Sequence, residues 1–403
     1  MTEFELVLRK HNGESSDLSA FSPAEAVKAQ TFHSGFAQYT QTPLTSLPAL
    51  AKALGVQSIH VKDESYRFGL NAFKVLGGSY ALGRFIAKKL DQPIEELPAK
   101  KILSDEVREK LGQLTFITAT DGNHGRGVAW TANQLGQKSV VYMPKGSALE
   151  RLENIRAEGA AASITDLNYD DAVRLADKHA RENDWVMVQD TAWEGYTDIP
   201  LWIMQGYMTM GHEIVQQLEQ AGQPAPTHVF LQAGVGSMAG AMTGFLAAYY
   251  GENRPFITIV EPKLADCLFR TAKADDGTLH NVTGDMNTIM AGLACGEPCS
   301  IGWAVLKNHA DAFLSVPESA AADGMRILAA PARGDTPIVS GESGAAAFGA
   351  AANLLLDEQL AHIKQALGLN ENSRLLFIST EGDTDRENYR NVVWRGKYPG
   401  GQA

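Results

Sequence analysis

Short apolar segments alternate with longer helical patterns along most of this chain. Two of the segments, VFLQAG (229–234) and LLFIST (375–380), are almost wholly apolar, as strands are when both of their faces are buried. This alternation predicts parallel sheets joined by crossover helices. The predicted strands are 58–62, 114–120, 138–144, 161–167, 185–190, 227–234, 255–262, 312–317 and 374–380. The predicted helices are 123–136, 147–159, 168–183, 199–222, 237–250 and 343–356.

The strand segments fall into two clusters, 114–190 and 227–380, and a long charged stretch at 84–113 precedes the first cluster. A single barrel of about eight strands is the alternative, because the number of segments comes near that count. The clustering favours an α/β protein with two doubly wound parallel-sheet domains and a ligand in the cleft between them. The predicted division is a small domain, 89–197, and a discontinuous large domain, 1–88 plus 198–403.

The net charge of −12 argues against nucleic acid or an anionic membrane as the main partner. The first residues are mixed and charged, unlike a secretory signal, and no apolar run is long enough to span a bilayer. These features predict a cytoplasmic protein.

The cysteines form a sparse set of three, Cys267, Cys295 and Cys299, which suits a reducing compartment. The spacing from Cys295 to Cys299 lacks the further ligands that a zinc site needs, so no metal is predicted. A pairing of Cys267 with Cys295 or Cys299 stays open.

Glycine-rich turns follow three of the predicted strands, at 118–127, 233–240 and 379–385. The second turn, AGVGSMAG, precedes a predicted helix. Glycines let successive backbone N–H groups converge, and a helix N-terminus adds positive partial charge. The turn therefore predicts a phosphate site on the backbone of Gly234, Val235, Gly236, Ser237 and Met238.

The same turn has a second interpretation. Gly234 and Gly236, with Gly240 further on and Glu261 at the end of the next strand, resemble a dinucleotide fingerprint. The third glycine stands one position late for that pattern. A nicotinamide-dependent dehydrogenase and a bare strand-to-helix turn therefore remain open as alternatives.

Lys74 stands in FGLNAFKVLGGSYALG (68–83), among small and apolar residues, where Asn71 is predicted to cap a helix. A lysine at a helix start usually extends to solvent, and that interpretation is the alternative. Burial would instead free the amine to form a Schiff base with an aldehyde. Pyridoxal phosphate is the cofactor that needs both a lysine and a phosphate cradle.

Five motifs follow one another along the chain in this order: AFKVLGG around Lys74, TDGNHGRG, GVGSMAG, TIMAGLACGEP (288–298) and STEGD. Together they resemble the tryptophan-synthase-β-like, fold type II pyridoxal-phosphate enzymes, which include threonine dehydratase and threonine synthase. Within that group the chain is most similar to the 2,3-diaminopropionate ammonia-lyases, including the detail QDTAWEGYTDIP (189–200). The resemblance spans roughly residues 30–395.

The resemblance implies a role for each matched position. Lys74 would be the Schiff-base lysine, with Phe73 beside the cofactor ring, and Asn123 would hydrogen-bond the phenolic oxygen. The backbone of 234–238 would take the phosphate, and Thr380 would face the pyridine nitrogen. A neutral hydroxyl at that nitrogen makes a weaker electron sink, which suits β-elimination.

Asp121 departs from the dehydratase pattern, which has Ser at that position. A carboxylate there suits an ammonium leaving group, and it would act as a second base opposite Lys74, so that both enantiomers lose their α-proton. Asp190 would bind the substrate's distal ammonium. An ordinary turn aspartate at 121 and a cap at 190 are the alternatives.

The implied activity is a pyridoxal-phosphate-dependent α,β-elimination that converts D- and L-2,3-diaminopropionate to pyruvate and ammonia. The implied partners are a small amino-acid substrate and a second copy of the chain in a homodimer. A serine or threonine dehydratase of the same fold stays open as an alternative.

Overall fold

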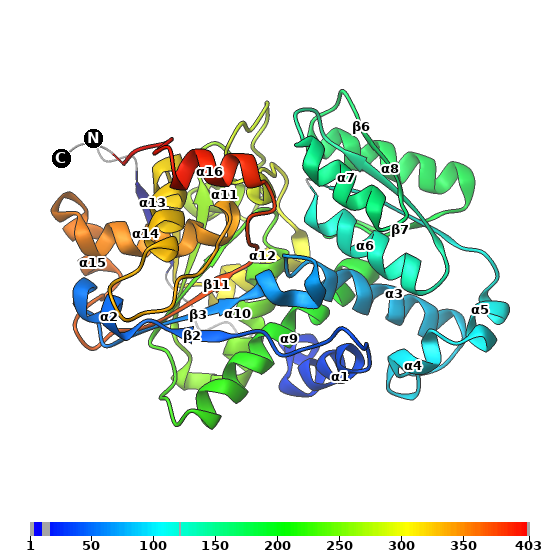
Figure 1. Ribbon diagram of the computed structural model, residues 1–403, viewed down its shortest axis with the longest axis horizontal. Coiled ribbons are helices and arrows are strands. Elements are labelled where there is room, and N and C mark those ends of the chain that lie inside the picture. The colour runs from blue at the N-terminus through cyan, green and yellow to red at the C-terminus, as the bar shows by residue number, and fades with distance from the viewer. Residues whose placement is uncertain (1–3, 10–16, 121, 401–403) are drawn as a thin grey trace.

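The computed structural model describes residues 4–9, 17–120 and 122–400, which form two lobes (Figure 1). One lobe holds a seven-stranded sheet and the other a four-stranded sheet. The larger sheet has the order β1 (Glu5–Leu8), β10 (Ala312–Val316), β9 (Phe256–Pro262), β8 (His228–Gln232), β11 (Arg374–Ser379), β3 (Ser58–Asp63), β2 (Leu44–Ser46). The smaller has the order β6 (Ala161–Ile164), β5 (Lys138–Met143), β4 (Thr115–Ala119), β7 (Val186–Met187).

The interior of the larger sheet is parallel, from β10 through β9, β8 and β11 to β3. Only the edge strands β1 and β2 run antiparallel to their neighbours. Every residue of the central strand β8 is buried, which explains its apolar sequence.

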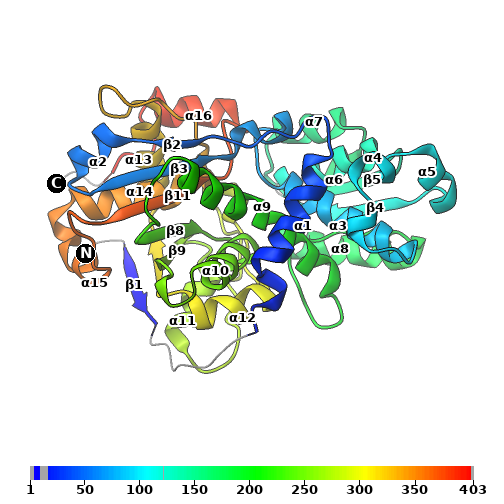
Figure 2. The ribbon, with the colours of Figure 1, turned by 90° about the horizontal axis from the view of Figure 1, so that it is seen from below.

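Helices cover both faces of the larger sheet (Figures 1 and 2). Alternate residues of β8 enter different cores: Val229 and Leu231 pack with α3 (Val75–Lys89), α9 (Asp198–Gln220) and α10 (Ser237–Tyr250). Phe230 packs with α13 (Glu318–Ala329) and α14 (Glu342–Leu356) on the opposite face. This is the layering that a doubly wound sheet requires.

The smaller sheet is parallel throughout and packs with α6 (Asn123–Gln134), α7 (Leu149–Ala157) and α8 (Tyr169–Asn183). The lobes meet where α3 packs against α6. A Cβ at Gly127 would lie 2.7 Å from the Cα of Val75, so only glycine allows this approach. All four strands lie within 89–197, and we propose those bounds for the small domain.

The remaining helices connect or cover these layers. They are α1 (Pro23–Ser34), α2 (Pro48–Leu54), α4 (Ala99–Ile102), α5 (Asp105–Leu111), α11 (Cys267–Ala274), α12 (Ser300–His309), α15 (Ala361–Ala366) and α16 (Arg386–Val393). Short 3₁₀ turns add Ser19–Phe21, Glu64–Gly69, Ile94–Glu96, Gly251–Asn253, Ala291–Leu293 and Glu358–Leu360.

The predicted α/β class and each predicted strand are confirmed, although 161–167 shortens to Ala161–Ile164 and 185–190 to Val186–Met187. The single-barrel alternative is wrong, because the strands form two separate sheets. The strands β1 and β2 were not predicted, since each is a short, partly exposed edge strand. The charged stretch 84–113 contains the end of α3 together with α4 and α5.

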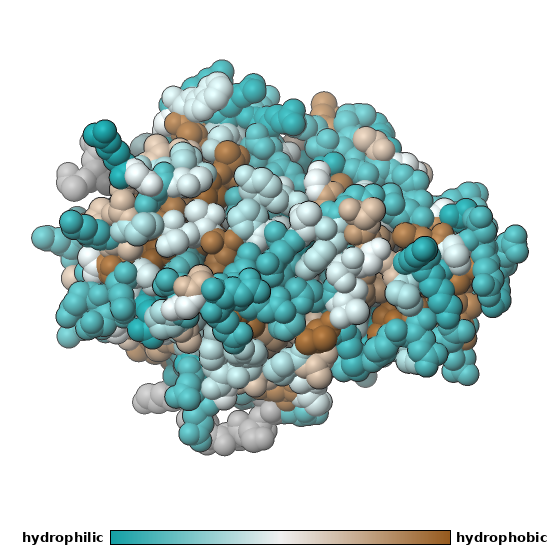
Figure 3. Space-filling model, turned by 60° about the horizontal axis from the view of Figure 1, so that its bottom comes forward, coloured by the Kyte–Doolittle hydropathy of each residue, from teal (hydrophilic) through white to brown (hydrophobic). Residues whose placement is uncertain are grey.

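The three cysteines are buried and none of them is in a disulfide, so neither pairing left open by the sequence is formed. Within the described ranges no group of three or more His, Cys, Asp or Glu side chains is placed to hold a metal ion. The same ranges contain no helix long and apolar enough to cross a membrane. Figure 3 shows one face of the molecule, which is mainly hydrophilic with hydrophobic residues in small scattered groups.

Candidate active site

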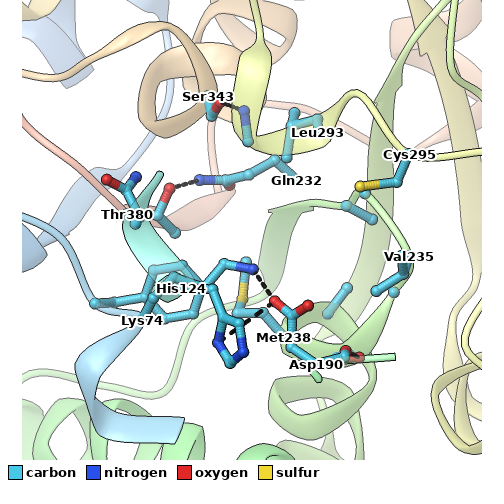
Figure 4. A pocket seen from close by; sticks show the side chains of 18 of the residues that line it. Lys74, His124, Asp190, Gln232, Val235, Met238, Leu293, Cys295, Ser343 and Thr380 are labelled. Atoms are coloured by element: carbon cyan, nitrogen blue, oxygen red, sulfur yellow. Dashed lines mark hydrogen bonds and ion pairs between the residues drawn. The ribbon is translucent and has the colours of Figure 1, made fainter. Parts of the chain in front are cut away.

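A cavity lies at the carboxyl ends of β4, β8 and β11, where doubly wound sheets bind ligands. Both lobes contribute to its wall (Figure 4). The lining residues are Phe73, Lys74, Thr120, Asn123, His124, Tyr169, Asp190, Gln232–Ala239, Gly292, Leu293, Cys295, Ser343, Thr380 and Glu381. Every predicted site residue that the structure describes is therefore in this one cavity.

Lys74 stands at the N-cap position of α3, and its amine forms an ion pair with the Asp190 carboxylate. The amine also lies 5.7 Å from the centre of the Phe73 ring. The lysine side chain is 17% exposed, so it lies at the wall of the cavity and does not extend into bulk solvent. The prediction that Asn71 caps this helix is wrong: Asn71 has a left-handed φ of 61°, three residues before the cap.

Asp190 is held from several sides, and its side chain is only 4% exposed. The Tyr169 hydroxyl donates to its Oδ1 (3.3 Å), and His124 Nδ1 lies 3.9 Å from its Oδ2. Burial works against the charged carboxylate. The positive charge of Lys74, followed by His124 and the hydrogen bonds, nevertheless holds the pKa of Asp190 well below its usual range. Figure 4 shows Lys74 and Asp190 pointing toward one another.

The glycine-rich turn joins β8 to α10 beside these charges, and the hydroxyl of Ser237 donates a hydrogen bond to the backbone carbonyl of Asp190. Gly236 has a left-handed φ of 97° at the N-cap, where no side chain caps the helix. A Cβ at Gly234 would lie 3.2 Å from Cys295 Sγ, and one at Gly236 would lie 3.0 Å from Leu268 Cδ1. An uncapped helix N-terminus of this kind presents its N–H groups to an anion.

The last strand brings two further groups to the cavity. The Thr380 hydroxyl accepts a hydrogen bond from Gln232 Nε2 at 3.0 Å, as drawn in Figure 4. The next residue, Glu381, accepts a hydrogen bond from Asn123 Nδ2 at 2.6 Å. Asn123 belongs to the first turn of α6, so this contact joins the two lobes.

Asp121, the predicted second base, lies outside the described residues. Its neighbours Thr120 and Asn123 line the cavity. Glu261, the acidic residue of the dinucleotide alternative, is fully buried, and its carboxylate accepts hydrogen bonds from the backbone of Leu268 and Phe269. A carboxylate used in this way to cap α11 has no access to a ribose hydroxyl.

A family model described as "Pyridoxal-phosphate dependent enzyme" matches residues 36–367 of this chain. The chain belongs to this family. Diaminopropionate ammonia-lyase of Salmonella typhimurium is 51% identical over 390 residues, which cover 96% of this chain and 96% of that protein.

Solved structures agree with this assignment. The crystal structure of diaminopropionate ammonia lyase from Escherichia coli in complex with D-serine matches with a TM-score of 0.91 and 48% identity over 98% of both chains. The structure of that enzyme in complex with an aminoacrylate-PLP azomethine reaction intermediate matches with a TM-score of 0.90 and 48% identity. It covers 99% of this chain and 98% of that one.

The residues present fit the cofactor of the family. The N-terminus of α10, where Gly236 adopts a left-handed φ and no side chain caps the helix, suits a phosphate. Lys74 places an amine in the same cavity, where the cofactor's aldehyde needs one. The individual roles predicted for Phe73, Asn123 and Thr380 stay predictions.

Several residues that line the cavity were not predicted as site residues, among them Tyr169, Gln232 and Glu381. Gln232 carried a signal, since it is a polar residue at the end of an apolar strand. Glu381 belongs to the STEGD motif, in which only Thr380 was given a role. Tyr169 carried no signal, because the partner that explains it, Asp190, is brought to it only by the fold.

Proposed function

We propose that this protein is a pyridoxal-phosphate-dependent lyase that converts 2,3-diaminopropionate and water to pyruvate and two molecules of ammonia. The observation that carries the proposal is the pairing of the Lys74 amine with the buried Asp190 carboxylate, in one cavity with an uncapped glycine-rich helix N-terminus. The similarity to diaminopropionate ammonia-lyases over 96% of the chain supports the substrate.

Lys74 has two tasks in this proposal, to anchor the cofactor through its amine and to take the α-proton of the substrate. When bound, pyridoxal phosphate withdraws the electron pair that the broken Cα–H bond leaves behind. The position of Lys74 at the start of α3 fixes its backbone, because the helix follows directly. The ion pair with Asp190 then holds the amine at the cavity wall.

Asp190 would bind the distal ammonium of the substrate. Its carboxylate already faces one cation, Lys74, and Tyr169 holds it from the other side. A second cation at the same carboxylate disfavours the ammonium form of Lys74, since like charges repel. Substrate binding would in this way prepare Lys74 to accept a proton, and the β-amine would leave as ammonia.

Asp121 would take the α-proton of the D enantiomer from the face opposite Lys74. This proposal rests on the carboxylate that replaces the dehydratase serine. Asp121→Asn is expected to reduce turnover of the D substrate far more than that of the L substrate, measured as pyruvate release. Equal losses for both enantiomers would contradict the two-base proposal.

The deciding experiment is pyruvate release by the purified protein from D- and L-2,3-diaminopropionate, measured beside L-serine and L-threonine. Strong release from diaminopropionate and little from the hydroxy acids is the expected result. Preference for serine or threonine would contradict the proposed substrate and favour the dehydratase alternative. A purified protein without the yellow absorption of bound pyridoxal phosphate would contradict the proposed cofactor.

We also propose that the protein is a cytoplasmic homodimer. The family resemblance supports the dimer, and the small number of cysteines, none of them in a disulfide, supports a reducing compartment. Sedimentation equilibrium checks the oligomeric state: twice the chain mass of 43.5 kDa is expected, and a single-chain mass would contradict it.

A further inference from the structure

Glu381 is a buried carboxylate of the cavity wall that the proposed reaction leaves without a task. It follows β11 in the large lobe and is 1% exposed. A buried carboxylate is costly unless its oxygens accept hydrogen bonds. The hydrogen-bond donors around the Glu381 carboxylate therefore indicate its role.

Three groups donate to this carboxylate. Oε2 accepts from Asn123 Nδ2 at 2.6 Å and from Thr384 Oγ1 at 2.8 Å. Oε1 accepts from the backbone N–H of Ser343 at 3.2 Å, in the first turn of α14. Two of the donors belong to the large lobe, whereas Asn123 belongs to α6 of the small lobe.

The contact decides which way the Asn123 amide is turned. The amide nitrogen of Asn123, and not its oxygen, faces Glu381, because Nδ2 donates to Glu381 Oε2. One N–H of Asn123 is used by this bond. The second N–H is left for an acceptor on a ligand in the cavity that Asn123 lines.

A second connection holds the same part of the small lobe. Arg151 Nη2 donates to Thr384 Oγ1 at 3.2 Å, and Thr384 in turn donates to Glu381. The Arg151 side chain packs on Gly122, where an added Cβ would lie 3.0 Å from Arg151 Cδ. Glu381 and Thr384 thus hold both Asn123 and the residue packed on its neighbour Gly122.

We infer that Glu381 is a positioning residue, which orients the Asn123 amide toward bound pyridoxal phosphate and joins the two lobes at the cavity. The inference rests on the proposed function only in that this cavity binds pyridoxal phosphate. It predicts that Glu381 acts through Asn123 and does not touch the reacting atoms.

The test is a double-mutant cycle in the cofactor-free protein, with variants E381Q, N123A and E381Q/N123A. The readout is the dissociation constant of pyridoxal phosphate, from a fluorescence titration. E381Q is expected to weaken binding about tenfold, which corresponds to about 1.4 kcal/mol, because the Asn123 amide loses the carboxylate that orients it. In the N123A background the same change is expected to have no further effect. E387Q, which removes an exposed carboxylate six residues later, is the matched control and is expected to change nothing.

E381D keeps a carboxylate but places it further from Asn123, because the side chain is shorter by one methylene group. It is therefore also expected to weaken the binding of pyridoxal phosphate. It serves in place of E381Q should that variant not fold. Equal losses from E381Q with and without Asn123, or unchanged affinity in E381Q and E381D, would overturn the inference while the proposed function stands. A wild-type protein that does not bind pyridoxal phosphate would overturn the proposed function and this inference together.

Discussion

Two lysines of this protein are paired with buried carboxylates, and their surroundings differ. Lys62, on β3, lies 2.6 Å from Glu213 Oε2, and both side chains are 0% exposed. Its amine also donates to the Thr42 carbonyl (2.8 Å) and to Gln217 Oε1 (2.9 Å). Lys74 pairs with Asp190 beside a cavity that a ligand can enter.

Arg67 completes the first cluster by donating to both Glu64 and Glu213. Two cations and two carboxylates thus neutralise one another in a fully packed interior. A buried charge whose hydrogen bonds are complete serves the fold, whereas a charge pair at a cavity is open to a ligand that competes for it. The comparison predicts that removal of Lys74 mainly lowers catalytic activity, whereas removal of Lys62 mainly lowers the free energy of unfolding.

The largest effect is expected at Lys74. Lys74→Met removes the amine that anchors the cofactor and moves the α-proton, so pyruvate release should fall on the order of 10⁴-fold. The loss should be in kcat, measured with saturating cofactor. Circular dichroism should show that the variant folds, because the Asp190 carboxylate borders the cavity and keeps its hydrogen bond from Tyr169 when Lys74 is removed. A residual activity above a tenth of wild type would contradict the role of Lys74.

Lys62→Met is the matched change in the closed cluster. It leaves Glu213 with one cation fewer in a fully buried place, so the free energy of unfolding should fall by about 3–5 kcal/mol. Urea unfolding measures this loss. The kcat of the folded fraction should stay near that of wild type, and a selective loss of kcat without loss of stability would break the comparison.

The open cavity should also respond to ligand, which the closed cluster cannot do. Pyridoxal phosphate at about 100 times its dissociation constant should raise the free energy of unfolding by about 2.7 kcal/mol. Thermal unfolding with and without the cofactor measures the gain. It should persist in Lys62→Met and diminish in Lys74→Met, and equal gains in both variants would contradict the comparison.

Glu342 is a buried side chain whose carboxyl group lies near a second carboxylate, Glu381, and not near a lysine. Burial, and then the charge of Glu381, raise the pKa of Glu342 from 4.5 to about 7. The folded state thus favours the protonated form, so the stabilisation is complete below pH 4.5 and is lost as the pH rises through 7. The free energy of unfolding of the wild type, relative to that of E342Q, should fall by about 2 kcal/mol between pH 5 and 8. Urea unfolding of both proteins at each pH measures the difference, and a constant difference would contradict the assignment.

The smallest effect is expected for an ion pair at the surface. Lys88 lies 2.7 Å from Asp198, and the two side chains are 67% and 61% exposed. Water screens such a pair, so Lys88→Ala should change the free energy of unfolding by about 0.5 kcal/mol or less. Urea unfolding at low and high salt checks this. A loss comparable to that of Lys62→Met would show that exposure does not decide the value of these pairs.

Much of the site was predictable because its residues come from local signals. A lysine at a helix start and the glycine-rich turn 234–238 can be recognised within a few neighbouring residues. The same holds for the strands β8 and β11, whose buried faces require apolar sequence. The edge strands β1 and β2 were not predictable, since pairing with a neighbour far along the chain defines them.

The α/β class, the order of the elements and the chemistry available at Lys74 can be derived from the amino-acid sequence, because each depends on residues close together in the chain. Which charged side chains meet depends instead on how the chain folds. Asp190 is 116 residues from Lys74, and Glu381 is 258 residues from Asn123. Hydrogen bonds and ion pairs act over a few ångströms, so their partners are selected by the packing of the two lobes and carry no signature in local sequence.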